Sequence, residues 1–356
     1  MSLSTKSRSR VLIVAIFAAS LVLAGCSKTS SSSSAQAAAT SAAPALSAVK
    51  VALVPGGAHP YFQPWKTGGQ AAVTDFGLGG TVFNETGEWD QTKQNAAIDS
   101  LAAQGYNAFG IFGVSPTDIN TTFESLKAKG YAVGSLASCP AGDVDKADFC
   151  LSTDTGVAAY IAAKAAIDAM GGSGNLVHLT GNAVDSNTQR RIKGVEKAVA
   201  ETNGKVKILT VITDIDKDLQ TAQKAVTDLL TSKGKQINGI VTTAYNPAVA
   251  ATEGVKSTKL PIKVIAIDDD PKILAAIADG TITGTVVQNP YGQAYAGSWV
   301  LAQLQTKACT MKAPGQYVDS GSFLVTKDKV TTYDAERLAK TKSLIEDFKS
   351  LYLTCK

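Results

Sequence analysis

The sequence has few of the residues that catalysis and metal binding most often use. Its 356 residues include only two histidines, His59 and His178, and neither lies near a cysteine. It contains no C-x-x-C pair, P-loop, G-x-S-x-G elbow or H-E-x-x-H motif, and no G-x-G-x-x-G follows the first apolar run. We therefore expect a protein that is not an enzyme and that has no cofactor and no metal site.

An excess of charge is also missing from most of the chain. The formal net charge is +4, but Lys6, Arg8 and Arg10 all lie in the first ten residues. Without them, 31 of the 34 basic residues remain against 30 acidic ones. A near-neutral body has no basic surface with which to neutralise phosphates, so we expect no nucleic-acid partner.

The N-terminus has the pattern of an export signal. Three basic residues precede an uncharged apolar run, Val11–Leu23, which is shorter than the ~20 residues that span a bilayer. The run ends in Leu23-Ala24-Gly25-Cys26, which resembles the lipobox of bacterial lipoproteins. We expect residues 1–25 to be removed and Cys26 to carry lipid that anchors the protein outside the cytoplasm. The alternative is an ordinary secretory signal followed by a chance cysteine.

The segment after Cys26 is too poor in apolar residues to build a core. Residues 26–47 are mostly Ser, Ala and Thr, which predicts a tether. Four cysteines follow it and can oxidise outside the cell, where they allow three pairings. We favour Cys139–Cys150 and Cys309–Cys355, although free thiols remain an alternative.

From Val49 onward, short apolar runs alternate with amphipathic stretches. The runs are continuously apolar, which is typical of strands buried on both faces of a parallel sheet. The stretches between them have helical spacing, as in Leu219, Ala222, Val226 and Leu229. The pattern predicts an α/β protein with two doubly wound parallel-sheet lobes and a ligand cleft between them. The runs are Val49–Val54, Thr81–Phe83, Ala108–Phe112, Ala132–Leu136, Leu176–Leu179, Val206–Ile212, Gly239–Val241, Val264–Ile267 and Thr285–Val287.

Polar and aromatic side chains follow several of these runs at the strand ends. Such a mixture suits a neutral polyhydroxy ligand, since hydroxyls both donate and accept hydrogen bonds. Each residue also has a simpler interpretation: Arg191 as a surface charge, Tyr61 as core, or Asp268 as a helix cap or metal ligand before Pro271. The candidate residues are His59, Tyr61, Phe62, Arg191, Asn246, Asp268 and Gln288.

The motifs around these candidates resemble the periplasmic sugar-binding proteins of ABC transporters, of the ribose-binding type. The resemblance runs from Val49 to about Tyr317 and implies the type I periplasmic binding protein fold. The matching motifs, in order, are His59-Pro60-Tyr61-Phe62, Ser152-Thr153-Asp154, Arg191-Ile192-Lys193-Gly194-Val195, Asn246-Pro247-Ala248-Val249-Ala250, Ala266-Ile267-Asp268-Asp269 and Gln288-Asn289-Pro290-Tyr291-Gly292.

The chain departs from that family at several ligand positions. The family's Asp-Arg pair after the fourth strand falls on Ala137-Ser138, so two strong ligand contacts are missing. His59 replaces an asparagine and Ile267 replaces an aromatic residue. We retain Ser138 as a site residue and add Trp89, which follows the second strand, as a wall of the cleft.

The resemblance implies lobe boundaries, a hinge and a function. It places 48–153 with 289–317 in the first lobe and 154–288 with 318–356 in the second, and the three segments of the hinge cross near Thr153, Gln288 and Tyr317. It implies a monomer that captures a sugar or polyol by hinge closure and delivers it to an ABC permease. The alternatives are a sensory lipoprotein of the same fold, with a ligand such as autoinducer-2, and an exported enzyme.

Overall fold

The computed structural model describes residues 45–142 and 144–356. The predicted signal peptide, Cys26 and nearly all of the predicted tether lie outside this range. Within the described part of the chain, no helix is both long enough and apolar enough to cross a membrane. All elements below belong to one unit, Ala43–Lys356.

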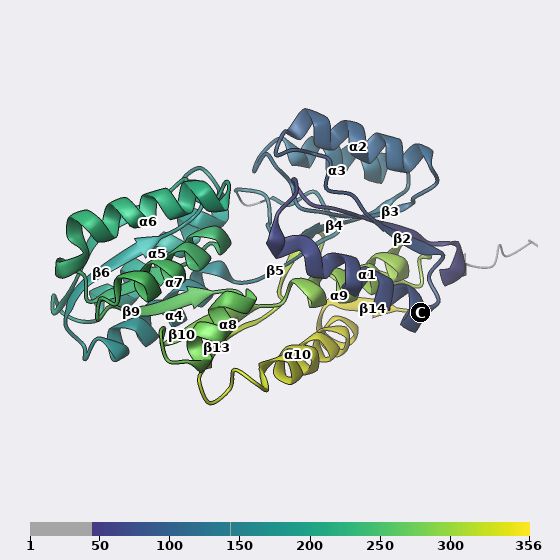
Figure 1. Ribbon diagram of the computed structural model, residues 1–356. Coiled ribbons are helices and arrows are strands. Elements are labelled where there is room, and N and C mark those ends of the chain that lie inside the picture. The colour runs from purple at the N-terminus through teal and green to yellow at the C-terminus, as the bar shows by residue number, and fades with distance from the viewer. Residues whose placement is uncertain (1–44, 143) are drawn as a thin grey trace, which may run out of the picture. The chain divides into compact units, whose positions relative to one another are not determined.

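The first lobe is built on a six-stranded sheet in which every pair of neighbours is parallel. Helices α2 and α3 cover one face of this sheet, and α1 and α9 cover the other (Figure 1). The strand order is β12-β5-β4-β3-β1-β2, with β12 Gln316–Asp319, β5 Phe149–Ser152, β4 Ala132–Leu136, β3 Ala108–Ile111, β1 Lys50–Val54 and β2 Gly80–Phe83. The helices are α1 Gln63–Phe76, α2 Gln91–Ala103, α3 Ile119–Ala128 and α9 Pro290–Gln305, with short 3-10 turns at Leu46–Ala48 and Pro60–Phe62.

The second lobe repeats this arrangement. Its sheet is parallel except for the edge strand β13, which runs antiparallel to β10. The strand order is β13-β10-β9-β8-β6-β7, with β13 Ser322–Thr326, β10 Gly284–Gln288, β9 Lys263–Ile267, β8 Gly239–Thr242, β6 Gly174–Leu179 and β7 Val206–Ile212. The helices are α4 Thr155–Ala169, α5 Ser186–Ala200, α6 Leu219–Lys233, α7 Tyr245–Thr258 and α8 Pro271–Ala278, with a 3-10 turn at Gly234–Gln236.

The burial of the strands explains their sequence. In β1, Val51 and Leu53 pack in the core beneath α1 and α9, whereas Ala52 and Val54 pack beneath α2 and α3. Both faces are therefore covered, and neither alternate set of side chains needs to be polar. All nine predicted runs coincide with strands, and the predicted two-lobed α/β fold is confirmed.

Three segments of the chain pass between the sheets close to one another. They are Thr153-Asp154 after β5, Asn289 after β10, and Ser320-Gly321 between β12 and β13. The last lies beyond the predicted position near Tyr317, because β12 continues to Asp319. Hydrogen bonds join the crossings: the Thr153 hydroxyl lies 3.3 Å from the Ser320 hydroxyl, and the Asn289 amide donates to the Ser320 carbonyl at 3.3 Å.

The end of the chain does not lie where the sequence prediction placed it. Helix α10, Tyr333–Asp347, packs against α9 of the first lobe. It continues through a π-helical turn, Phe348–Tyr352, into β14, Leu353–Cys355, which pairs with β11, Cys309–Met311. Assigning all of 318–356 to the second lobe was therefore wrong. An amphipathic helix can cover either lobe, and its sequence does not indicate which apolar surface is left uncovered.

Candidate ligand-binding site

A cavity of about 530 Å³ lies between the carboxyl ends of the two sheets and is lined by both lobes. The position is the one that two facing parallel sheets favour, because loops and helix N-termini gather there. Of the nine predicted site residues, eight line the cavity: His59, Tyr61, Phe62, Trp89, Ser138, Arg191, Asp268 and Gln288. The ninth, Asn246, lies behind the lining.

The loop after β1 supplies an aromatic cluster. Pro60 begins a 3-10 turn whose N-cap is His59, and the Nδ1 atom of His59 accepts a hydrogen bond from the Tyr61 backbone at 3.3 Å. Phe62 is buried and packs edge to face against Trp65 and Phe112, with ring centroids 5.0 and 5.2 Å away. Phe62 thus belongs to the core and to the cavity wall at once.

The Tyr61 hydroxyl contacts helix α9. It donates to Oε1 of Gln293 in α9 at 3.2 Å. Burial raises the pKa of Tyr61 well above its ordinary value, and the nearby Asp268 carboxyl adds to this effect. Tyr61 therefore stays protonated at neutral pH and acts as a hydrogen-bonding group with an aromatic face.

The indole of Trp89 packs against the backbone of the loop that follows β1. The Trp89 backbone is left-handed, with φ of 59°, and its N–H donates to the Gly56 carbonyl at 2.9 Å. A Cβ atom at Gly57 would lie 2.8 Å from the indole Nε1, and one at Gly56 would lie 2.9 Å from the ring carbon Cε3. The two glycines thus let the indole approach the backbone closely, while 45% of Trp89 stays exposed.

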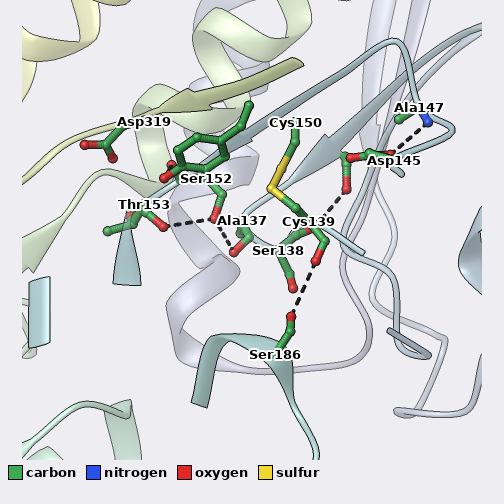
Figure 2. Close-up of a disulfide and its surroundings, with 12 residues drawn as sticks. Ala137, Ser138, Cys139, Asp145, Ala147, Cys150, Ser152, Thr153, Ser186 and Asp319 are labelled. Carbon is green, nitrogen blue, oxygen red and sulfur yellow. Dashed lines mark hydrogen bonds between the residues drawn. A yellow bond between two sulfur atoms is a disulfide. The ribbon is translucent and has the colours of Figure 1, made fainter. Parts of the chain in front are cut away.

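The loop after β4 connects the lobes and presents Ala137 and Ser138 to the cavity (Figure 2). The Ala137 carbonyl accepts hydrogen bonds from the Ser152 hydroxyl at 2.8 Å and from the Asn187 amide of α5 at 3.2 Å. The hydroxyl of Ser186, also from α5, donates to the Cys139 carbonyl at 3.4 Å. Ser138 therefore reaches the cavity on a loop whose backbone is held from both lobes.

The predicted disulfide holds the same loop. Cys139 is bonded to Cys150 in β5, and Cys309 is bonded to Cys355, as the sequence predicted. Asp145 lies beside the first disulfide, and burial raises its pKa to about 6. Because both sulfur atoms are bonded to each other, this cluster offers no thiolates to a metal ion.

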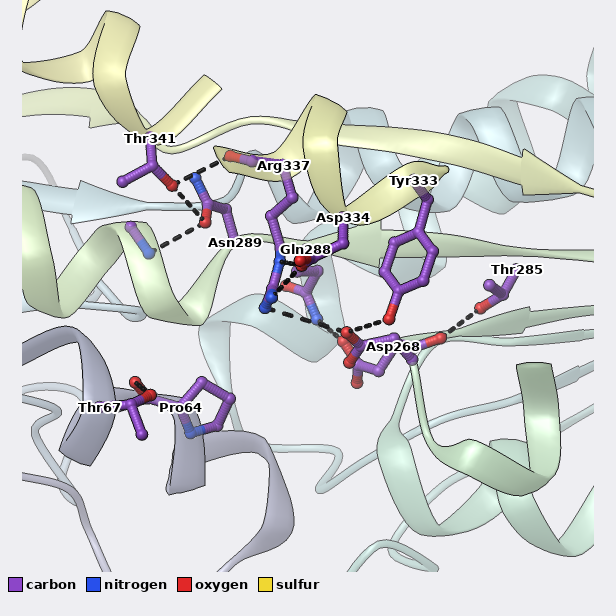
Figure 3. Close-up of polar contacts among 12 residues, drawn as sticks. Pro64, Thr67, Asp268, Thr285, Gln288, Asn289, Tyr333, Asp334, Arg337 and Thr341 are labelled. Atoms are coloured by element: carbon purple, nitrogen blue, oxygen red, sulfur yellow. Dashed lines mark hydrogen bonds and ion pairs between the residues drawn. The ribbon is translucent and has the colours of Figure 1, made fainter. Parts of the chain in front are cut away.

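Asp268 is the most deeply buried carboxyl group of the cavity. Only 5% of it is exposed, and its Oδ1 atom accepts a hydrogen bond from Gln288 Nε2 at 2.8 Å (Figure 3). Burial raises its pKa to about 7, although the Gln288 hydrogen bond acts in the opposite direction. Asp270, not Asp268, caps α8 by accepting from the Lys272 backbone at 2.8 Å. The interpretation of Asp268 as a helix cap is therefore wrong.

Arg191 and Asn246 have different positions relative to the cavity. Arg191 projects from α5 into the lining, and among the described residues its buried Nε atom has no hydrogen-bond partner. The Asn246 amide donates to the Asp216 carbonyl at 2.9 Å and lies 3.4 Å from His59 Nε2. Arg191 thus reaches the cavity, whereas Asn246 positions its neighbours.

The sequence analysis missed several residues of the lining. Phe112 follows β3, Asp216 follows β7 and Asp268 follows β9. The criterion that predicted Asp268, a position just after a strand, therefore also identifies Phe112 and Asp216. Asp185 and Asn187 lie at the start of α5 after a longer loop, and burial raises the pKa of Asp185. The missed residues with the clearest position in the wall are Phe112, Asp185, Asn187, Asp216 and Tyr245.

A second hollow of about 420 Å³ shares Tyr61, Tyr245 and Asp268 with the main cavity. Its far side includes Arg337 of α10, whose guanidinium lies 3.9 Å from Asp269, and the Tyr333 hydroxyl donates to Asp269 at 3.2 Å. Helix α10 therefore touches the second lobe at its N-terminal end and the first lobe along its remaining length.

Two facing α/β lobes, three adjacent crossings and a cavity lined from both sides define a two-lobed binding protein. Residues 51–308 match the model of the periplasmic binding protein domain, and the chain belongs to this family.

Similar proteins include a xylitol-binding protein of Mycolicibacterium smegmatis, which is 27% identical over 247 residues, covering 68% of this chain and 67% of that protein. The ribose import binding protein of Bacillus subtilis is 24% identical over 233 residues, covering 65% and 73%. A carbohydrate transporter solute-binding protein from Agrobacterium radiobacter, solved with D-arabinose, has a TM-score of 0.71 at 24% identity and covers 82% and 98%. This last likeness supports the fold.

Proposed function

We propose that this protein captures a small sugar or polyol between its lobes and delivers it to an ABC permease while lipid on Cys26 anchors it to the membrane. The main support is the cavity itself, where Asp268, Gln288 and Arg191 face an aromatic wall. Relatives named for binding xylitol and importing ribose support the ligand class. The function needs no chemical conversion of the ligand.

Hinge closure is the mechanism that follows from a site divided between two lobes. A ligand that contacts both walls has more favourable interactions in the closed state than in the open one, so it shifts the population toward closure. Arg191, Asp268 and Gln288 bind hydroxyls from the second lobe, while Tyr61 and Trp89 pack against the ligand from the first. A permease can then distinguish the loaded protein from the empty one by the closed arrangement.

The first prediction tests capture and closure together. Titration calorimetry of the purified protein with xylitol, D-ribose and D-arabinose should show saturable binding of at least one of them, and X-ray scattering should show a smaller radius of gyration when it is bound. Asp268→Ala should weaken binding about tenfold or more, which corresponds to ~1.4 kcal/mol, because ligand hydroxyls lose a buried charged acceptor. Absence of binding by all three compounds, or binding that Asp268→Ala leaves unchanged, would contradict this proposal.

A further inference from the structure

The polar atoms on the first-lobe wall of the cavity are mostly engaged within that lobe. The Tyr61 hydroxyl donates to Gln293, and His59 Nδ1 accepts from the Tyr61 backbone. Glu88 forms an ion pair with Lys93, and both side chains are exposed. Ser138 adds one hydroxyl to this wall, so the first lobe offers a ligand few polar groups.

The rest of the first-lobe wall is largely apolar. Trp89 stands at its centre, with ring centroids 6.1 Å from His59, 6.2 Å from Phe62 and 6.0 Å from Phe112. Because the indole already lies against Gly56 and Gly57, its exposed part needs no rearrangement to receive a ligand. The apolar residues of this wall are Phe62, Trp89, Phe112, Val114, Pro116 and Ala137.

The second-lobe wall has the opposite character. Asp268 and Gln288 are buried at its base, and the Arg191 Nε atom has no hydrogen-bond partner among the described residues. Asp185 and Asp216 lie beside them in the same lining. A ligand between the lobes therefore meets hydrogen-bonding groups on one side and aromatic carbon on the other.

We infer that the ligand is an amphipathic sugar derivative with its hydroxyls on the second lobe and an apolar substituent, such as a glycosidic alkyl or aryl group, on Trp89. This inference rests on the proposed function, since it divides the same cavity between two parts of one ligand. A plain sugar or polyol can place only its C–H faces there, because a hydroxyl pointing at Trp89, Phe112 or Val114 would lose water without gaining a partner. An apolar group there loses water without losing hydrogen bonds.

Matched pairs of compounds test the inference by calorimetry. The parents are D-ribose, D-arabinose and xylitol, and the derivatives are the methyl and phenyl glycosides of the two sugars. We expect a phenyl glycoside to bind about tenfold more tightly than its parent, because it adds aromatic contact with Trp89. Trp89→Ala should remove most of that difference and Trp89→Phe should keep much of it. Leu351→Ala, which alters an exposed apolar residue outside the cavity lining, should leave it unchanged.

Tryptophan fluorescence gives an independent measure of the same contact. The chain has three tryptophans, and Trp65 and Trp299 are buried away from the cavity lining. A spectral change on adding the phenyl glycoside that disappears in Trp89→Phe assigns the contact to Trp89.

The outcomes separate this inference from the proposed function. If the parents bind as tightly as their glycosides, or if Trp89→Ala leaves the ratio of affinities unchanged, the apolar part of the ligand is wrong and sugar capture stands. If none of the parents and none of the glycosides binds, both ideas are wrong.

Discussion

At the scale of single residues, the ionisation of Asp268 should affect both ligand binding and the stability of the fold. It lies at the end of β9 with a left-handed φ of 68°, and its carbonyl accepts from the Thr285 hydroxyl at 2.7 Å. Because burial raises its pKa from 3.8 to about 7, the folded protein holds this proton more tightly than the unfolded chain does.

The pH dependence of stability follows from that shift. Between pH 4 and pH 7, roughly the interval over which the folded and unfolded chains differ in this proton, the free energy of unfolding should fall as pH rises, and it should level off above it. Asp268→Asn removes this contribution, so the variant should gain stability relative to wild type as pH rises, by on the order of 1.4 kcal/mol per unit of pKa shift. Denaturant unfolding of both proteins from about pH 4 to about pH 9 measures the difference.

Affinity should change with pH in the opposite direction. An ionised Asp268 accepts hydrogen bonds from ligand hydroxyls better than a protonated one, so wild-type affinity should rise as pH increases through about 7. Asp268→Asn should lack that rise, whereas Asp270→Asn at the α8 cap should retain it. Parallel pH profiles of wild type and Asp268→Asn would show that Asp268 does not titrate in this range.

At the scale of elements, α10 and the disulfide between Cys309 and Cys355 hold the last part of the chain on the first lobe. Leu344, Phe348 and Leu353 enter the same core as strand β1 and helix α9. Across the crossings, the Thr341 hydroxyl donates to Asn289 Oδ1 at 3.1 Å (Figure 3). The bond between Cys309 and Cys355 closes a separation of 46 residues between β11 and β14.

Removing that bond should destabilise the protein more than removing the other one. In the chain-entropy model, the loop closed by Cys309–Cys355 contributes ~4 kcal/mol and the shorter loop closed by Cys139–Cys150 contributes ~3 kcal/mol. Double Cys→Ala variants of each pair, compared by denaturant unfolding, test this order. Hydrogen exchange should increase in α10 only when Cys309 and Cys355 are replaced. An equal exchange rate in α10 for both variants would mean that core packing alone holds this helix.

At the scale of the whole molecule, the proposed membrane anchor depends on Cys26, which lies outside the described residues. Cys26→Ser should move the protein from the membrane fraction to the soluble fraction, because serine cannot take the thioether-linked lipid. Ser27→Ala, a change at the adjacent position, should leave the wild-type distribution in place. Retention of the Cys26→Ser protein in membranes would contradict lipid anchoring. It would leave ligand capture untouched, since the cavity lies in the separate unit Ala43–Lys356.

Local sequence was sufficient to predict β1 to β4 and β6 to β10 and their order along the chain. Runs such as Val49–Val54 and Val264–Ile267 are continuously apolar because helices cover both faces of each sheet. Five strands were not predicted: β5, β11, β12, β13 and β14. β12 and β13 lie at sheet edges, are only partly buried, and carry the mixed sequence of exposed segments. β5 is fully buried, but it has only four residues.

The site could be predicted only as far as its residues follow strand ends. Asp268 follows β9 directly and Gln288 is the last residue of β10, and the resemblance of their motifs placed them in one cavity. This criterion could not show that Asp216 lines the cavity while Asn246 lies behind it. That difference depends on how the two side chains pack against each other. Likewise, the roles of Asp268 and Asp270 were separated only by their hydrogen bonds.

The sequence by itself determined the export pattern, the alternation of strands and helices and the polar groups at the strand ends, because each is a local property of the chain. It only favoured the cysteine pairing, which the tertiary structure decided. Only the tertiary structure decided that α10 returns to the first lobe and that Trp89 lies on Gly56 and Gly57. It also decided that one wall of the cavity is aromatic while the other carries the hydrogen-bonding groups. These features depend on contacts between segments far apart in the chain, and such contacts are selected by the fit of whole surfaces, which no local pattern encodes.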